Sequence, residues 1–264
     1  MDIKEINVVK IGGNVIDDPS ALIDFIGNFA KLQGPKILVH GGGKEATRLS
    51  KALGIETVMI EGRRVTDRET IDVVTMTYAG LINKRVVALL QAAGCDALGF
   101  SGADGNLIKA TKRAPNPIDY GYVGDINPAD VNDRLLKMLL ESGITPVVCA
   151  ICHDGNGMLL NCNADSVASA VAVGSSRIAS SVLTYCFEKA GVLADVYDES
   201  SLIPLVTEEN FDSLKADGTI AKGMIPKLHN ALDAAGKGVT AVRICKADNL
   251  LNEVGTIVKL SSQQ

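Results

Sequence analysis

The stretch NVVKIGGNVI, residues 7–16, is a short apolar strand that ends at a lysine, an isoleucine and two glycines. Residues 37–46, ILVHGGGKEA, repeat the pattern, since an apolar strand runs into glycines that open a helix. Such loops leave backbone N–H groups free, and a helix start adds the positive end of its dipole. Because the carboxyl ends of parallel strands share one edge of a sheet, both loops predict a cradle for a phosphate or carboxylate, to which Lys10 adds a full positive charge.

Strand-like runs alternate with longer segments of helical period along the chain, which is typical of βαβ units. The sequence therefore predicts an α/β fold, a three-layer α/β/α sandwich with a mainly parallel central sheet. Strands are expected at 6–11, 36–40, 146–151, 178–187 and 239–244, with a strand, a glycine turn and a second strand within 96–113. Helices are expected at 19–33, 44–54, 68–94, 163–174 and 223–238.

No repeat and no Pro/Ser linker divides the sequence. We therefore expect a single domain over 1–264, with an N-terminal lobe at about 1–178 and a C-terminal lobe at about 179–264.

Composition excludes several classes of protein. The 264 residues have a net charge of −5 with scattered Lys and Arg, so the sequence predicts neither a nucleic-acid partner nor an anionic membrane surface. The N-terminus does not resemble a secretory leader, and no apolar run reaches the roughly 20 residues of a bilayer span, which predicts a cytoplasmic protein. The six cysteines lie among Val, Leu and Ile and are expected to be reduced core residues.

Several familiar motifs fail on inspection. Gly43-Lys44 is followed by Glu45, so the loop is not a Walker A sequence. The same glycines fit a loose dinucleotide fingerprint, which is weak when it occurs alone. HGGG also occurs in esterases, but the chain has no Gly-x-Ser-x-Gly nucleophile turn. CAIC, residues 149–152, lies inside an apolar strand and is interpreted as core.

Two later stretches carry further polar residues. NCNAD places Asn161, Asn163 and Asp165 at a helix start, where one of them is expected to be a plain N-cap and three exceed what a cap requires. In GMIPK, Lys227 falls in the first turn of a helix. A cation there is disfavoured by the helix dipole unless an anion is bound, although a solvated lysine would fit the spacing too.

VVKIGG, VHGGG, EGRRVTD, NCNAD and KGMIPK, in this order and spread over essentially the whole chain, resemble the amino acid kinase family. Within that family the motifs are similar to those of members that act on N-acylated glutamate. The resemblance implies ATP-dependent phosphorylation of the γ-carboxylate of N-acetyl-L-glutamate to N-acetylglutamyl 5-phosphate, a step of arginine biosynthesis. Succinyl in place of acetyl, or a non-catalytic module that senses an amino acid or nucleotide, remains an alternative, and so does a dinucleotide-dependent oxidoreductase.

The resemblance also implies roles for individual residues. Lys10 would stabilise the phosphoryl group in transfer, Lys227 the charge on the ADP side, and Asp165 would hold both ammonium groups. The remaining implied contacts are Gly12 and Gly13 to the phosphate, and Gly42, Gly43, Arg64 and Asn161 to the substrate, the last two at its α-carboxylate.

The chain departs from the family around the expected nucleotide site. It has CFEKAGVL, residues 186–193, where a Ser-Asp-Val-x-Gly turn is usual, and Lys222 where an acidic residue is common. Nucleotide contacts are expected from Glu188, Gly191, Lys222, Gly223 and Met224. Mg²⁺ is expected to arrive on ATP, with no metal site built by the protein.

Assembly is also an expectation from the resemblance. Arginine-inhibited members have a helix ahead of the first lysine, and only nine residues precede Lys10. We therefore expect a homodimer indifferent to arginine, with a contact through the apolar helix around residues 70–84.

Overall fold

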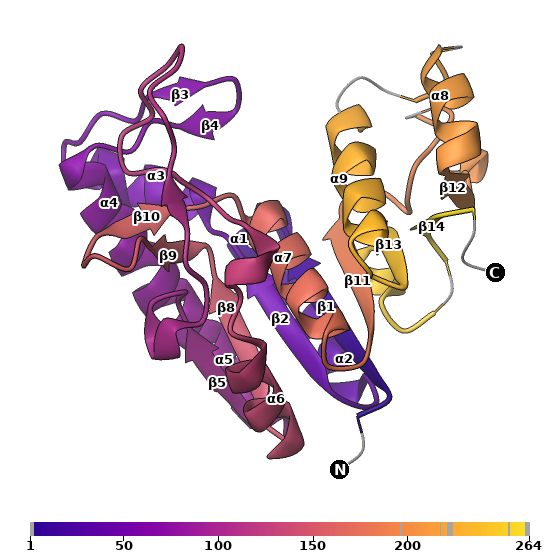
Figure 1. Ribbon diagram of the computed structural model, residues 1–264, viewed down its shortest axis with the longest axis horizontal. Helices are drawn as coiled ribbons and strands as arrows, with labels where there is room; N and C mark the ends of the chain where they lie inside the picture. The colour runs from indigo at the N-terminus through magenta and orange to yellow at the C-terminus, as the bar shows by residue number, and fades with distance from the viewer. Residues whose placement is uncertain (1–2, 196, 217, 221–223, 253, 262–264) are drawn as a thin grey trace.

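An eight-stranded sheet crosses the whole structure (Figure 1), in the order β12-β14-β13-β11-β1-β2-β8-β5. This computed structural model describes residues 3–195, 197–216, 218–220, 224–252 and 254–261. Pairing is parallel from β5 to β13, β14 is antiparallel to β13, and β12 runs parallel to β14. The strands are β1 (Glu5–Ile11), β2 (Lys36–His40), β5 (Ala97–Phe100), β8 (Thr145–Cys149), β11 (Ser180–Phe187), β12 (Leu205–Thr207), β13 (Ala241–Lys246) and β14 (Thr256–Lys259).

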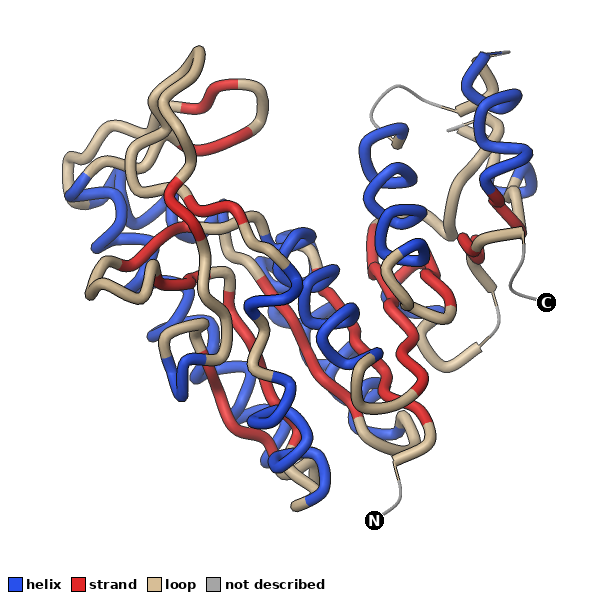
Figure 2. The backbone as a smooth tube through the Cα atoms, in the orientation of Figure 1, coloured by secondary structure: helices blue, strands red, loops and turns tan. Residues whose placement is uncertain are grey.

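Helices cover both faces of this sheet, as Figure 2 shows. One face packs against α6 (Asp133–Glu141), α7 (Ala164–Ser176) and α9 (Ile225–Gly236), and the other against α2 (Pro19–Lys31) and α5 (Asn83–Ala92). The predicted three-layer α/β/α sandwich is therefore confirmed. The remaining α-helices of the described residues are α1 (Gly13–Asp17), α3 (Gly43–Ala52), α4 (Arg68–Thr75) and α8 (Glu208–Ala216).

Local sequence explains why α2 and α7 form where they do. The Asp18 carboxylate accepts hydrogen bonds from the backbone N–H groups of Ser20 and Ala21 and so caps α2, whose apolar stripe faces the core. Asn163 caps α7 in the same way, which confirms a plain N-cap role for one of the three polar residues of NCNAD. The small residues of α7 let it lie against β1 and β11, between α6 and α9.

Three expected elements differ from the structure. The helix expected at 68–94 is continuous from 68 to 92 but contains a π-helical segment, Met76–Ile82, between α4 and α5. The strand expected at 146–151 ends at Cys149, and β9 (Ile151–His153) turns away to pair with β10 (Leu159–Asn161). The second strand expected within 96–113 is only β6 (Thr111–Lys112), which pairs with β7 (Gly124–Asp125) and not with β5.

The helical run from Arg68 to Ala92 reaches the length and mean hydropathy of a membrane span, so the expectation that no segment does so is wrong on those two measures. The same run belongs to the core of this fold. Its apolar side chains pack with those of β5, β8 and α2, and the buried ones include Ile71, Val74, Val86 and Leu90. A buried core helix satisfies the same length and hydropathy limits.

All six cysteines are buried and free, as expected. Cys149 and Cys152 sit at consecutive short strands in the core, and burial raises the pKa of the Cys149 thiol to about 12. These thiols are therefore protonated, inert packing groups at neutral pH.

The strand ends beside β1 are level with one another. Ile11 pairs with His40 of β2 on one side and with Cys186 of β11 on the other. The chain leaves β1 toward β2 and β8, and later returns to place β11 on the opposite side of β1. Such a reversal of strand order is where open α/β sheets bind ligands, so the loops after β1, β2 and β11 converge on one place.

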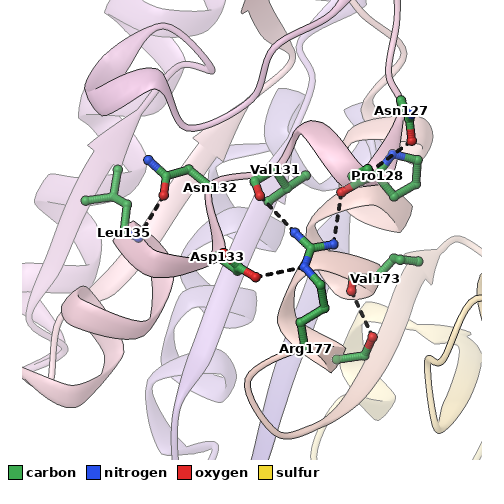
Figure 3. A network of polar contacts seen from close by, with 10 residues as sticks. Asn127, Pro128, Val131, Asn132, Asp133, Leu135, Val173 and Arg177 are labelled. Carbon is green, nitrogen blue, oxygen red and sulfur yellow. Dashed lines mark hydrogen bonds and ion pairs between the residues drawn. The ribbon is translucent and has the colours of Figure 1, made fainter.

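An arginine fixes the far end of α7 (Figure 3). The Arg177 guanidinium donates to the Asp133 carboxylate at 2.8 Å and to the carbonyl oxygens of Pro128 and Val131 at 3.2 and 2.8 Å. This joins the C-terminus of α7 to the loop ahead of α6. The amino end of α7, which holds Asp165, is therefore carried on a helix anchored at both ends.

Candidate active site

An ion pair lies at the carboxyl end of the sheet. The ammonium group of Lys10, on β1, is 2.7 Å from a carboxylate oxygen of Asp165, on the first turn of α7. Lys10 is only 8% exposed, so the charge is held by its partner and not by bulk water. Tyr185 of β11 holds the main chain of Asp165, since the Tyr185 hydroxyl donates to the Asp165 backbone carbonyl at 3.2 Å.

The glycine loops that the sequence singled out flank this ion pair. Gly12 ends β1 and leads into α1, and Gly42 precedes α3. A Cβ at Gly42 would overlap the Ile82 side chain and lie 3.0 Å from the Tyr78 ring, so the backbone must be bare there to pass the π-helical segment. The close approach keeps the loop open toward Lys10.

Two cavities meet at these loops. The first has a volume of about 270 Å³ and the second about 540 Å³. Both are lined by Lys10, Gly12, Gly13 and Gly43. A group held at this shared wall would be reached from either side, which is the arrangement needed for transfer between two bound molecules.

Arg64, on β4 (Arg63–Arg64), lines the first cavity and is buried. Its guanidinium donates to the Gly43 carbonyl at 2.9 Å and to the hydroxyl groups of Thr47 and Thr57 at 2.8 and 3.2 Å. These bonds use three of its five donors and tie the hairpin of β3 (Met59–Ile60) and β4 to the second glycine loop. The remaining donors can face a bound anion.

Asn161 enters the first cavity from the end of β10. Its amide donates to the Thr66 hydroxyl at 3.0 Å, a bond between residues far apart in the sequence, and the side chain is 9% exposed. Gly42 lines the same cavity, so all four expected substrate contacts are brought together here.

The second cavity gathers most of the expected nucleotide contacts. Glu188, Gly191 and Met224 line it together with Lys227. Gly191 is required by packing, since a Cβ there would lie 2.6 Å from the Thr256 hydroxyl and 2.7 Å from Leu202. The expected contacts at Lys222 and Gly223 lie outside the described residues.

Lys227 projects from the first turn of α9 into the second cavity, as the sequence predicted. Burial lowers the pKa of Lys227, the charge of Lys10 lowers it further, and the carboxylates of Asp165 and Glu188 oppose that shift. An incoming anion would favour the charged ammonium form and is therefore bound more strongly by this group.

Sequence reasoning missed Phe187, Tyr78 and His40. Phe187 ends β11 and its ring lies beneath the ammonium groups of Lys10 and Lys227, with 5.4 and 3.8 Å from nitrogen to ring centroid. Tyr78 lines the first cavity from the π-helical segment. Because this segment departs from α-helical periodicity, the sequence pattern does not predict that the Tyr78 side chain faces the cavity. No short sequence pattern marks Phe187, because the two lysines that its ring faces come from β1 and α9.

Fold and site together define an α/β protein with a buried lysine and two glycine loops between two cavities, at the point where strand order reverses. Residues 5–246 match the model of the amino acid kinase family. The chain is 50% identical over 258 residues to an acetylglutamate kinase of Cytophaga hutchinsonii. The aligned region covers 96% of this chain and 97% of that protein. It is 45% identical over 256 residues to an acetylglutamate kinase of Bacteroides thetaiotaomicron, covering 97% of this chain and 99% of that protein.

Among solved structures, smu.665 from Streptococcus mutans UA159 superposes with a TM-score of 0.75 at 28% sequence identity and covers 96% of this chain and 98% of that chain. The chain therefore belongs to the amino acid kinase family.

Proposed function

We propose that the chain is an ATP-dependent kinase that phosphorylates the γ-carboxylate of N-acetyl-L-glutamate and yields N-acetylglutamyl 5-phosphate in arginine biosynthesis. Relatives that match over nearly their full length carry the name acetylglutamate kinase, which supports this substrate. The observation that carries the mechanism is Lys10, which lines both cavities and is paired with Asp165 of the second cavity.

The acylated glutamate is assigned to the first cavity. Arg64 and Asn161 would receive its α-carboxylate, because a guanidinium and an amide supply the N–H donors that an anion needs. The γ-carboxylate would then point toward Lys10 and the glycine loops. No general base is required, since a carboxylate is already ionised at neutral pH.

ATP is assigned to the second cavity, with Glu188, Gly191 and Met224 along its wall and Lys227 beside the phosphates. An oxygen of the γ-carboxylate attacks the γ-phosphorus of ATP, the bond to the bridging oxygen breaks, and ADP leaves with that electron pair. Lys10 and the N–H groups near Gly12 and Gly13 stabilise the transferring phosphoryl group, while Lys227 stabilises the leaving oxygen. Asp165 orients the Lys10 ammonium through the ion pair and acts on the Lys227 ammonium electrostatically from a greater distance.

Mg²⁺ is proposed to enter as part of the ATP substrate. Among the described residues no group of three His, Cys, Asp or Glu side chains is placed to hold a metal ion. The lysines and backbone N–H groups suit phosphate oxygens and not a cation, so the metal would bind on the nucleotide side.

This assignment also gives the two lobes separate tasks. Residues up to about 178 would bind the acylated glutamate and residues from about 179 would bind ATP, with transfer at the β1–β11 boundary. We place the enzyme in the cytoplasm, where ATP and free amino acids are available to it.

The experiment that tests the proposal follows ADP release with N-acetylglutamate and free glutamate as acceptors. We expect turnover with the acylated substrate only. Lys10→Ala and Lys227→Ala should each lower kcat by about 100-fold or more, with a smaller change in KM for ATP, because each removes a charge that acts on the transition state. Asp165→Asn should also lower kcat. Near-normal turnover in both lysine variants would exclude this mechanism.

A second acyl group is favoured by one observation. Arg63 lines the first cavity next to Arg64 and would be available for a further carboxylate, such as that of a succinyl group. The same assay with N-succinylglutamate decides this, and Arg63→Leu is the matched variant. If succinyl is the natural group, this change should raise KM for N-succinylglutamate and leave KM for N-acetylglutamate unaltered.

A further inference from the structure

One aromatic ring underlies both lysines of the site. Phe187, half-buried at the end of β11, has the Lys227 ammonium 3.8 Å and the Lys10 ammonium 5.4 Å from its ring centroid. Both distances lie within the roughly 6 Å at which a ring face attracts a cation through its quadrupole. Nothing in the proposed mechanism so far uses this ring.

The two ammonium groups need such support. Lys10 has a full ion pair with Asp165. Lys227 is held differently, since in the described part of the chain no carboxylate lies within 4.0 Å of its nitrogen. Burial and the neighbouring Lys10 charge both favour its neutral form. Asp165 and Glu188, the two carboxylates that act on Lys227, oppose this from a distance.

The orientation of the ring is fixed by its own neighbours. Phe187 stacks on Tyr185, with centroids 6.0 Å apart and ring planes at 22°. The Tyr185 hydroxyl donates to the backbone carbonyl of Asp165, so the two rings are connected to the first turn of α7 that carries the carboxylate. The face that Phe187 presents to the lysines is therefore set by the same strand and helix that place Asp165.

We propose that Phe187 is a positioning residue for phosphoryl transfer, whose ring face keeps the Lys227 ammonium charged and holds it beside that of Lys10 before ATP binds. This inference rests on the proposed kinase function. A polar or small side chain at this position would leave two repelling cations with one carboxylate between them. The ring supplies attraction without an anion that would compete with the phosphates.

The test replaces Phe187 with mono-, di- and trifluorinated phenylalanine by genetic incorporation. Fluorination barely changes ring size but withdraws the negative charge from the ring face in steps. We expect kcat for ADP release to fall stepwise, by about tenfold over the series, while KM for N-acetylglutamate stays constant. Trifluorophenylalanine at Phe25, whose ring contacts Phe29 in the core, is the control and should leave kcat unchanged. A kcat that does not vary along the series would reduce Phe187 to a steric wall and overturn the proposal.

A second readout does not depend on activity. Lysines methylated with ¹³C-formaldehyde report their pKa by NMR, and the Lys227 signal is identified by its loss in Lys227→Arg. The pKa of Lys227 should be lower in the trifluorinated form than with phenylalanine, because the weakened ring face attracts the ammonium less. If the wild-type chain releases no ADP from ATP with any acylated glutamate as acceptor, the kinase proposal fails, yet this titration still decides whether the ring holds the ammonium. An unchanged pKa would overturn the inference even in an active enzyme.

Discussion

Arg64 serves the fold as well as the candidate site. Three of its donors bind Gly43, Thr47 and Thr57, so the side chain is oriented before any substrate arrives. An arginine that is already held loses little side-chain freedom when an anion binds. Its geometry therefore favours a substrate carboxylate at low entropic cost.

Arg64→Lys tests this role. A lysine cannot make the planar pair of bonds, so we expect KM for N-acetylglutamate to rise at least tenfold while KM for ATP changes little. The measurement is steady-state kinetics with each substrate varied in turn. An equal rise in both constants would mean that Arg64 only braces the hairpin, and Arg63→Lys is the control for the same exchange at the neighbouring position.

His40 forms a buried polar chain under the second glycine loop. Its Nδ1–H donates to the Gly41 carbonyl at 2.8 Å, and its Nε2 accepts from the Asn83 amide at 3.1 Å. Asn83 also donates to the Val147 carbonyl and accepts from Lys84. These bonds need a neutral imidazole, and complete burial lowers the pKa of His40 to about 4.

The pH dependence of stability follows from that depressed pKa. His40 titrates near 6.5 in the unfolded chain and near 4 when folded, so the unfolded state takes up its proton first as the pH falls. Stability from this residue is complete above pH 6.5 and is lost toward pH 4, amounting to about 2 kcal/mol by pH 5. Urea unfolding at pH 7 and pH 5 measures it.

The control for this prediction is His40→Asn, which keeps a donor toward Gly41 but does not titrate. Effects of surface carboxylates cancel in the comparison. If the variant loses as much stability as the wild-type chain between the two pH values, His40 is not the group responsible.

At the level of elements, length decided what could be predicted. The strands that cross the core and the helices around 19–33 and 163–174 were predicted because several apolar residues repeat with one period. The two-residue strands β3, β4, β6 and β7 are too short to show a period, and only their pairing, β3 with β4 and β6 with β7, defines them. The turn between β8 and β9 could not be predicted from the sequence either, because both strands are apolar and form one continuous apolar run.

The candidate site divides in the same manner. Lys10, the glycine loops and Asp165 could be found because they stand next to elements with a strong pattern. Phe187 could not, since its importance comes from two lysines on β1 and α9 that only the folded sheet brings over its ring. Such contacts depend on register between strands, which no single stretch of sequence specifies.

The anchor at the end of α7 gives a prediction about stability. Arg177→Met removes three hydrogen bonds between α7 and the loop before α6, so we expect the free energy of unfolding to fall by about 1 to 3 kcal/mol. Arg68→Met is the matched control, because its exposed ion pair to Asp72, at 3.9 Å, should contribute less than about 0.5 kcal/mol. Equal losses in both variants would contradict the anchoring role.

For the molecule as a whole, we propose assembly as a homodimer through the helical run 68–92. Met76 and Leu81 of this run are 52% and 43% exposed, which leaves apolar surface for a second copy. Light scattering should give twice the chain mass of 27.7 kDa. Leu81→Glu should shift the mass toward the monomer, whereas Met138→Glu, at an exposed position on α6, should not.

Regulation can be measured on the same preparation. We expect kcat and KM to be unaltered by added arginine. A hexameric mass would refute the dimer. A sigmoidal fall in activity as arginine is added would refute the indifference to arginine.

The central place of β1 in the sheet has a consequence for how the chain is made. One edge of β1 pairs with β11, so the pairing of residues 5–11 cannot be completed until residues 180–187 have left the ribosome. At about 5 to 20 residues per second, translation needs roughly 10 to 35 s to deliver that partner. For this time the nascent chain presents an open, apolar strand edge able to pair with other chains. Production of the enzyme should therefore depend on chaperones that shield this edge during synthesis.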